Sequence, residues 1–284
     1  MFIKKKKNEI LFSKMHGLGN DFVIIENITQ NISYFPYKAI STLSDRKLGI
    51  GFDQLLLIER SNVTNIDFHY RIFNANGIEV TQCGNGARCI AHFLSLKGLT
   101  QKTEIHISTI NRKMVLQILE NNNIKVNMGE PNFNLHDIPC LLKKNSDFYS
   151  IAVLNQTLKF GIVSMGNPHC TTIIDHLHNS IIESIGPIIA THELFPTGIN
   201  VGFMEIIQDN YISLRVYERD VGETQACGSG ACAAVAIGIK NKILNKTTKV
   251  KLLGGYLSIS WKGPGTPMYM IGPSVHVYDG IIKI

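Results

Sequence analysis

Two cysteines stand in nearly the same short motif, one in each half of the chain. Residues 81–89 read TQCGNGARC and residues 224–232 read TQACGSGAC, so Cys83 and Cys227 each precede a Gly-x-Gly-Ala segment. Two similar halves that each present a thiol on a glycine turn suit proton transfer at a single carbon. One thiolate removes a proton from one face, and the opposing thiol returns a proton to the other face.

The position of each thiol favours this chemistry. Helices are predicted over Ala87–Lys97 and Ala231–Lys242, directly after the two motifs. The dipole and the free N–H groups at a helix N-terminus favour a thiolate. The N–H groups of Gly84-Asn85 and Gly228-Ser229 would form anion sites there, and a substrate carboxylate at such a site is stabilised as charge develops on its α-carbon. The motifs therefore predict α-proton removal from an amino acid, with no cofactor and no metal.

The six cysteines of the chain leave other interpretations open. A lone free cysteine is most often a small buried hydrophobic residue. The absence of a C-x-x-C sequence argues against zinc, and also against a thiol-disulfide protein that uses the two motif cysteines as a redox pair. A module that only binds its ligand is a further alternative. The cysteines outside the glycine turns, interpreted as structural, are Cys89, Cys140, Cys170 and Cys232.

The composition argues against several classes of function. The net charge of +6 arises in part from Lys4–Lys7, which we interpret as a solvated tail, and no basic stripe with interleaved aromatic residues indicates nucleic-acid binding. No apolar run approaches the ~20 residues of a membrane span, and no signal-peptide pattern follows the N-terminal lysines. With 44% hydrophobic and 18% charged residues, the sequence indicates a globular, cytoplasmic protein.

Strand patterns dominate the chain, and the two helices after the motifs begin apolar on every side, which is typical of buried helices. We therefore expect an α+β fold of two pseudo-symmetric domains, each a mostly antiparallel sheet wrapped around one central helix. The expected domains are residues 1–127, joined by the C-terminal strand 274–284, and residues 128–273. Strands are expected at residues 22–26, 54–59, 66–73, 104–108, 112–118, 124–128, 157–163, 169–174, 200–207, 211–217, 249–252, 256–261 and 268–273.

Together these residues resemble the diaminopimelate epimerase family of pyridoxal-independent amino-acid epimerases. The resemblance runs from about Ser13 nearly to the end of the chain. Beyond the two cysteine motifs it rests on MHGLGNDF at 15–22, GFDQ at 51–54, YRIFN at 70–74, MGNPH at 165–169, VYER at 216–219 and HVYDG at 276–280. Because so many matches occur in order, the resemblance is specific.

The resemblance implies interconversion of LL- and meso-2,6-diaminopimelate, a step toward lysine and peptidoglycan precursors. It implies an active site in the cleft between the two domains, a small-molecule substrate, no cofactor and a homodimer. Cys83 and Cys227 would transfer the proton, while His169 and Glu218 would help set the protonation of the thiols. The substrate-binding residues would be Asn20, Gln54, Asn74, Gly84, Asn85, Asn167, Asn200, Glu218, Arg219, Gly228 and Ser229.

The implied substrate explains these residue types, because diaminopimelate carries two amino-acid ends. Arg219 offers a bidentate fork for the distal carboxylate, Glu218 accepts from the reacting ammonium, and asparagines both donate and accept. We expect these substrate-choosing residues to be unduplicated, unlike the cysteine turns. The alternative is a related two-cysteine racemase of the proline or hydroxyproline type, whose cyclic substrate lacks a second amino-acid end.

The sequence departs from the family pattern beside the expected site. Asn76 and Ile78 stand where Asp and Ser are expected, and Asp220-Val221 replaces a smaller Gly-Ala-like pair after Arg219. These departures concern the rate or the stability of the two segments more than the reaction itself.

Overall fold

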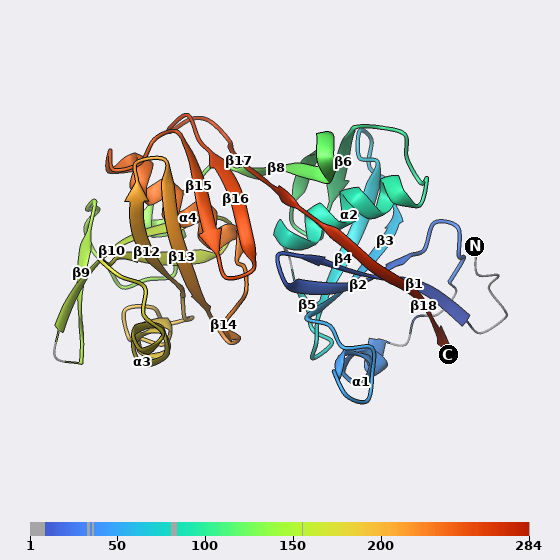
Figure 1. The fold of residues 1–284 in the computed structure, drawn as a ribbon, viewed down its shortest axis with the longest axis horizontal. Coiled ribbons are helices and arrows are strands. Elements are labelled where there is room, and N and C mark those ends of the chain that lie inside the picture. The colour runs from blue at the N-terminus through green and yellow to red at the C-terminus, as the bar shows by residue number, and fades with distance from the viewer. Residues whose placement is uncertain (1–8, 33–34, 36, 81–83, 155, 284) are drawn as a thin grey trace. The chain divides into compact units, whose positions relative to one another are not determined.

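The computed structural model describes residues 9–32, 35, 37–80, 84–154 and 156–283, and the chain divides into two compact units (Figure 1). Unit 1 comprises Met1–Val126 with Pro273–Ile284, and unit 2 comprises Asn127–Gly272. Each unit combines a mostly antiparallel sheet with few helices. The predicted α+β class is therefore confirmed.

The sheet of unit 1 follows the order β18–β1–β2–β3–β4–β6–β7–β8, with β5 sharing an edge of β4 with β6. Pairing is parallel between β2 and β3 and between β4 and β6, and antiparallel elsewhere. The chain's last strand thus lies beside its first. The strands are β1 (Glu9–Gly17), β2 (Asn20–Glu26), β3 (Gln54–Arg60), β4 (Phe68–Asn74), β5 (Glu79–Val80), β6 (Glu104–Ser108), β7 (Lys113–Ile118), β8 (Asn123–Gly129) and β18 (Val275–Lys283).

Helices cover both faces of this sheet. The helix α2 (Gly84–Leu96) packs on one face against β1, β2 and β7, and almost all of it from Asn85 to Leu94 is buried. The short α1 (Ile40–Ser44) lies over the other face, where Val23 and Ile25 join a core cluster that includes Ile40. Short 3-10 turns are η1 (Tyr37–Ala39) and η2 (Glu120–Asn122).

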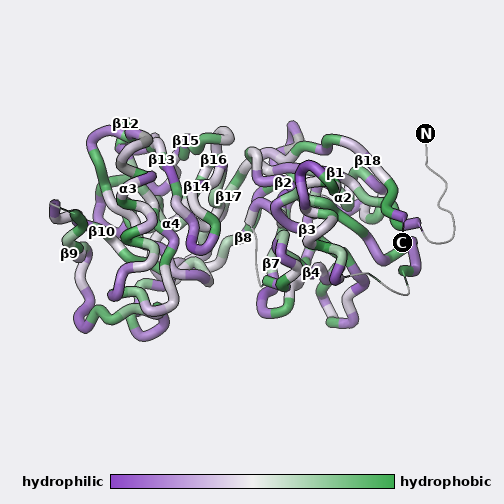
Figure 2. The backbone as a smooth tube through the Cα atoms, turned by 90° about the horizontal axis from the view of Figure 1, so that it is seen from below, coloured by the Kyte–Doolittle hydropathy of each residue, from purple (hydrophilic) through white to green (hydrophobic). Residues whose placement is uncertain are grey.

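The sheet of unit 2 follows the order β9–β10–β11–β12–β13–β15–β16–β17, with β14 paired to β13. Its parallel pairs are β11 with β12 and β13 with β15. Hydrophobic and hydrophilic stretches interleave along its strands, as they do in unit 1 (Figure 2). The strands are β9 (Tyr149–Val153), β10 (Gln156–Ser164), β11 (Pro168–Ile173), β12 (Asn200–Gln208), β13 (Tyr211–Glu218), β14 (Gly222–Glu223), β15 (Thr247–Leu252), β16 (Gly255–Ser260) and β17 (Met268–Pro273).

The helix α4 (Gly228–Lys240) is the central helix of unit 2, and it packs close to its sheet because small residues line the contact. A Cβ added to Gly161 on β10 would lie only 2.5 Å from Ile237 Cγ2, so a larger residue there would push the helix away. The helix α3 (Asn179–Ala190) packs against β12 and β13, and its Ile182, Ile185 and Ile189 belong to a second core cluster. A 3-10 turn, η3, spans Leu135–Asp137.

The two units repeat one pairing pattern. An antiparallel pair, a parallel pair and an antiparallel pair run from β1 to β4 in unit 1 and from β10 to β13 in unit 2. The buried helices α2 and α4 follow the equivalent short strands β5 and β14. The predicted pseudo-symmetry is therefore present in the topology of the strands as well as in the cysteine motifs.

Candidate active site

Cys227 lies at the N-terminus of α4 and caps it. Its Sγ accepts a hydrogen bond from Gly230 N at 3.4 Å and lies 3.6 Å from Ser229 Oγ. The helix begins at Gly228, three residues before the predicted start, because the thiol takes the capping place that Ser or Asp usually fills. The N–H groups of Gly228 and Ser229 therefore lie in the first turn, where an α-helix leaves its N–H groups without helical acceptors.

The ionisation of Cys227 differs from the expectation for a helix N-terminus. Burial of the thiol, which is 5% exposed, and the charge of Glu218 together raise its pKa well above the ordinary value. The hydrogen bonds with Ser229 and Gly230 act in the opposite direction but are outweighed. The tendency of a helix N-terminus to favour a thiolate therefore does not dominate the pKa of Cys227. Desolvation and a like charge outweigh the helix terminus, and the residue rests as a thiol.

Glu218 and Arg219 follow one another where β13 ends. Thr224 Oγ1 donates to Glu218 Oε1 at 2.5 Å, which holds the carboxylate near Cys227. Arg219 N donates to Asn200 Oδ1 at 3.0 Å, and Arg219 Nη1 donates to Thr197 O at 2.8 Å. The guanidinium is held at one edge, yet its side chain remains 36% exposed. Its Nε also lies 3.5 Å from a carboxylate of the chain itself, Asp220 Oδ2.

Gly198 makes the position of Arg219 possible. Its φ is +72°, and a Cβ added there would lie 2.7 Å from Arg219 Cδ. A larger residue would be strained in its backbone and would also displace the arginine side chain.

His169 is buried and neutral. Burial, with the nearby charge of Arg219, lowers the pKa of His169 to about 3. Its Nε2 lies 3.1 Å from Asn167 Oδ1, and Asn200 Nδ2 donates to Pro168 O at 3.0 Å. Unit 2 thus brings together its predicted residues around Cys227, Glu218 and Arg219. In this environment His169 orients Asn167 and does not supply a positive charge.

The predicted residues of unit 1 form a chain of amide hydrogen bonds at the start of α2. Asn85 Nδ2 donates to Asn20 Oδ1 at 3.2 Å, and Asn20 Nδ2 donates to Asp53 Oδ2 at 2.8 Å. A carboxylate only accepts, so Asp53 fixes which end of the Asn20 amide points toward Asn85. Cys83, the predicted catalytic residue of this unit, lies outside the described residues. Gly84 is the first residue of α2.

Gln54 and Asn74 form the second amide pair of unit 1. Gln54 Nε2 donates to Asn74 Oδ1 at 2.8 Å, where β3 and β4 pair directly. Gln54 Oε1 is buried and has no hydrogen-bond partner among the described residues. A buried acceptor without a partner costs stability, which is the condition that a ligand ammonium would relieve.

A charged network behind Asn20 was not predicted from the sequence. Arg46 bonds both Asp21 and Asp53, and Lys14 Nζ bonds Asp21 at 2.6 Å and also Gly51 O. The pKa of Asp21 falls to about 2 because the bonds to Arg46 and Lys14 outweigh its burial. The sequence signal for Asp21 and Asp53 is their place inside the motifs MHGLGNDF and GFDQ.

The strand registers relate the predicted residues of the two units. Phe22 pairs with Gln54 as His169 pairs with Asn200. Asn20 stands two residues before Phe22, and Asn167 stands two residues before His169. Gln54 pairs with Asn74 in unit 1. In unit 2 Val201 pairs with Tyr217, so extending that antiparallel register by one residue sets Asn200 opposite Glu218. The expectation that the substrate-choosing residues are unduplicated was therefore wrong in position. Their places are duplicated: Asn20 and Asn167 are the same residue type, whereas Glu218 stands where unit 1 has Asn74.

Comparison with known proteins identifies the family. The family model described as diaminopimelate epimerase matches residues 12–134 and 161–277. The chain belongs to the diaminopimelate epimerase family. This membership makes it an isomerase of the epimerase type.

Solved structures with the same fold confirm the two-domain architecture of this family. A hydroxyproline epimerase from Agrobacterium vitis, with bound trans-4-hydroxy-L-proline, matches with a TM-score of 0.68 and 13% identity over 97% of this chain and 93% of that one. A PhzF-family phenazine biosynthesis protein from Bacillus anthracis matches with a TM-score of 0.63 and 16% identity, over 98% and 100% of the two chains. A methylitaconate-delta-isomerase matches with a TM-score of 0.65 and 11% identity, over 96% and 95%.

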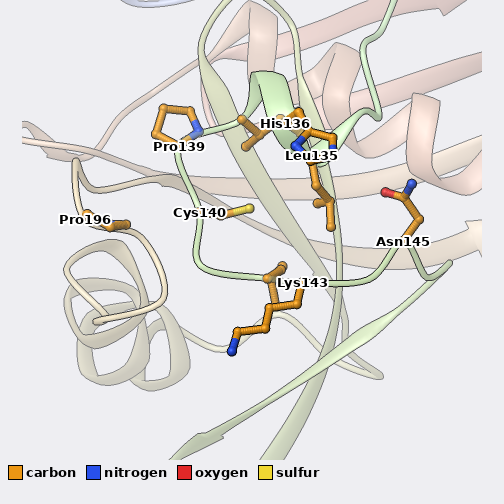
Figure 3. Close-up of a pocket in the computed structure, with 9 residues that line it drawn as sticks. Leu135, His136, Pro139, Cys140, Lys143, Asn145 and Pro196 are labelled. Atoms are coloured by element: carbon orange, nitrogen blue, oxygen red, sulfur yellow. The ribbon is translucent and has the colours of Figure 1, made fainter.

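Features away from these residues contribute nothing to the candidate site. A cavity of about 390 Å³ in unit 2 has Leu135, Cys140 and Asn145 in its lining and contains none of the predicted site residues (Figure 3). Cys89, Cys170 and Cys232 are buried, and burial raises the pKa of the Cys170 thiol. Among the described residues, no three His, Cys, Asp or Glu side chains gather as a metal site, and no helix is long and apolar enough to cross a membrane.

Proposed function

We propose that this family member epimerises LL-2,6-diaminopimelate to meso-2,6-diaminopimelate without a cofactor. Cys83 and Cys227 each serve one face of the α-carbon and exchange acid and base roles with the direction of reaction. The enzyme acts as a cytoplasmic homodimer that supplies lysine and peptidoglycan precursors. The observation that carries the proposal is the arrangement at the N-terminus of α4. The thiol of Cys227 lies there near the carboxylate of Glu218, and Arg219 follows Glu218 in the chain.

The resting thiol of Cys227 sets its first role. A buried thiol with a raised pKa is a proton donor, so Cys227 returns the proton while Cys83 removes one. The N–H groups in the first turn of α4 bind the reacting carboxylate, and those of Gly84 and Asn85 do the same at α2. This arrangement stabilises the charge that develops when the α-proton leaves.

The amide residues and the arginine choose the substrate. Gln54 Oε1 accepts from a substrate ammonium, and Asn20, Asn74, Asn85, Asn167 and Asn200 complete the polar contacts. Arg219 binds the distal carboxylate. A substrate with two amino-acid ends uses both the neutral and the charged groups, whereas a cyclic amino acid has no distal carboxylate for the guanidinium.

The second candidate is a racemase or epimerase of proline or hydroxyproline. The likeness to a hydroxyproline epimerase over nearly the full length of both chains favours it. Both candidates use the same two thiols, so the substrate alone distinguishes them.

Solvent exchange decides between the candidates. The protein is incubated in D₂O separately with LL-diaminopimelate, meso-diaminopimelate, L-proline and trans-4-hydroxy-L-proline, and α-deuterium is followed by mass spectrometry and NMR. We expect exchange and epimerisation with diaminopimelate only, and no epimerisation in a Cys227→Ala control. Exchange with proline or hydroxyproline alone overturns the substrate, and exchange with none of them indicates a binding module or a redox thiol pair.

A further inference from the structure

Each unit holds an arginine–glutamate pair at the turn before its cysteine motif. In unit 2, Arg215 Nε and Nη2 donate to the two carboxylate oxygens of Glu223 at 2.5 and 2.6 Å. The side chains are only 11% and 22% exposed. The bond is bidentate, which fixes the orientation of the two side chains as well as their separation.

Unit 1 contains the same arrangement. Arg71 Nε and Nη2 donate to the two carboxylate oxygens of Glu79 at 2.9 and 2.8 Å. Arg71 is further confined because Nη1 donates to Tyr37 Oη at 2.6 Å and the guanidinium lies 4.9 Å from the centre of the Phe73 ring. The Arg71 side chain is therefore held on three sides, and the pKa of Glu79 is lowered by its bonds to the arginine.

The two pairs occupy equivalent register positions. Phe73 pairs with Glu79 across β4 and β5, and Tyr217 pairs with Glu223 across β13 and β14. In each unit the arginine stands two residues before the paired aromatic residue. The residues between the paired aromatic residue and glutamate form a turn of equal length, 74–78 in unit 1 and 218–222 in unit 2. We call each Arg–Glu pair, with its enclosed turn, a turn clamp.

The clamp of unit 2 lies on the sheet face opposite the candidate site. Val216 approaches Gly230 of α4, whereas Tyr217 approaches Gly186 of α3, so successive residues of β13 point to opposite faces. Arg215 therefore shares the α3 face with Tyr217, and Glu218 shares the α4 face with Val216. The arginine has no place in the site itself, yet it holds the turn from behind.

We propose that the two turn clamps are positioning elements of the reaction. The clamp of unit 1 fixes Asn74, and the clamp of unit 2 fixes Glu218 and Arg219, each against the segment that leads into a cysteine. This inference rests on the proposed function. A bidentate arginine–carboxylate pair with little exposure also contributes to folding, more than an exposed ion pair does, so the test compares activity per folded molecule. Holding polar groups in reactive geometry gives a reason for the pair at both equivalent turns.

The experiment compares Arg215→Lys and Glu223→Gln in unit 2 with Arg71→Lys and Glu79→Gln in unit 1. Lysine keeps the charge and loses the bidentate fork, so it separates geometry from charge and still allows folding. The folded fraction of each variant is measured first. The kcat and KM of α-deuterium exchange with LL-diaminopimelate are then determined per folded molecule. We expect kcat/KM to fall about 100-fold in each variant. A rise in KM should accompany the fall in unit 2, because Arg219 lies on that turn, and a fall mainly in kcat is expected in unit 1.

Asp67→Asn is the matched control. Asp67 forms an ion pair with Lys102 at 2.5 Å in unit 1, away from either turn, so its loss should change kcat/KM by less than about twofold. Clamp variants that keep wild-type kcat and KM per folded molecule overturn the proposal and leave the clamps as structural pairs. If the wild type exchanges proline and not diaminopimelate, only the proposed substrate fails, and the same comparison with proline then tests the clamps. A wild type that exchanges no substrate overturns both.

Discussion

Units 1 and 2 share a strand-pairing pattern and differ in the charge placed on it. At the equivalent positions unit 1 carries the uncharged amides Asn20, Gln54 and Asn74, whereas unit 2 carries Asn167, Asn200 and Glu218. The residue after Glu218 is Arg219, and the residue after Asn74 is an alanine. The duplicated backbone thus supplies helix termini and turns to both units, while side-chain changes at the turns place the charges in only one of them.

The charges of unit 1 lie behind its amides. Asp53 orients Asn20 and is itself held by Arg46, which also bonds Asp21. In unit 2 the equivalent asparagine, Asn167, is oriented by a neutral histidine. The same amide is therefore held by an ion network in one unit and by a buried ring in the other.

The largest effect expected from the comparison concerns the two cysteines. In the proposed mechanism each thiol serves one face of the substrate carbon, so Cys83→Ser or Cys227→Ser alone should lower epimerisation by about 10²- to 10⁴-fold, the range that general acid–base catalysis contributes. The initial rate of LL-to-meso conversion checks this prediction. Cys232→Ser is the control, since that thiol is buried within α4. Near-normal turnover in either motif variant would show that the duplication does not serve two faces.

Glu218→Gln tests the charge that unit 2 alone carries. The neighbouring carboxylate opposes formation of the Cys227 thiolate and so raises the pKa of that thiol. Without it the thiol ionises at lower pH, so the alkaline limb of kcat/KM should move to lower pH. The rate should also fall about 100-fold, because the proposed hydrogen bond from the substrate ammonium loses the charge of its acceptor.

A control variant separates this local effect from a general change of charge. Glu205 is another carboxylate of unit 2, and it bonds Leu177 N at 3.3 Å. Glu205→Gln should leave the alkaline limb where it is in the wild type. An unmoved limb in Glu218→Gln would mean that Glu218 does not set the ionisation of Cys227.

Much of the fold could be predicted because burial leaves a periodic pattern in the sequence. The expected strand at residues 104–108 coincides with β6, and that at 268–273 coincides with β17. The helix α3 was missed, since Gly186 and Pro187 within it indicate a break, yet its isoleucines pack on a sheet face. Tertiary packing outweighed the local signal there.

The candidate site was predicted less completely than the fold. Its polar residues could be named from motifs, but their partners come from distant strands. Arg46 reaches Asp21 and Asp53 only after β2 and β3 pair, and no local pattern records that contact. The direction in which the pKa of Cys227 shifts could not be predicted for a similar reason. The resemblance implied that Glu218 affects the thiols, but burial of Cys227, the largest cause of the shift, arises only from the folded surroundings.

The two departures from the family pattern lie at the turn surfaces. Ile78 is 62% exposed and Val221 is 70% exposed, while Asn76 Oδ1 accepts from Ile78 N at 3.0 Å and Asp220 has a φ of 63°. Asn and Asp tolerate turn and left-handed conformations, so both turns form without the expected residues. The turns differ in this respect from the clamps behind them, which keep the same residue types in both units.

The smallest effect is expected where the units hold one position with different rings. Phe22 and His169 occupy equivalent places, and both are almost fully buried. Because the pKa of His169 is lowered to about 3 from the ordinary histidine value of 6.5, the unfolded chain binds a proton below about pH 6.5 while the folded chain does not. The free energy of unfolding should therefore decrease as pH falls from about 6.5 toward 3, by about 2 kcal/mol at pH 5.

His169→Phe should remove this contribution and cost about 1 kcal/mol at pH 7 for the lost bond to Asn167. Urea unfolding at pH 5 and pH 7 measures both values, with His176→Gln as a control because that side chain is 75% exposed. Equal pH dependence in wild type and His169→Phe would show that the histidine is protonated in the folded protein, and the two units would then differ by a further charge.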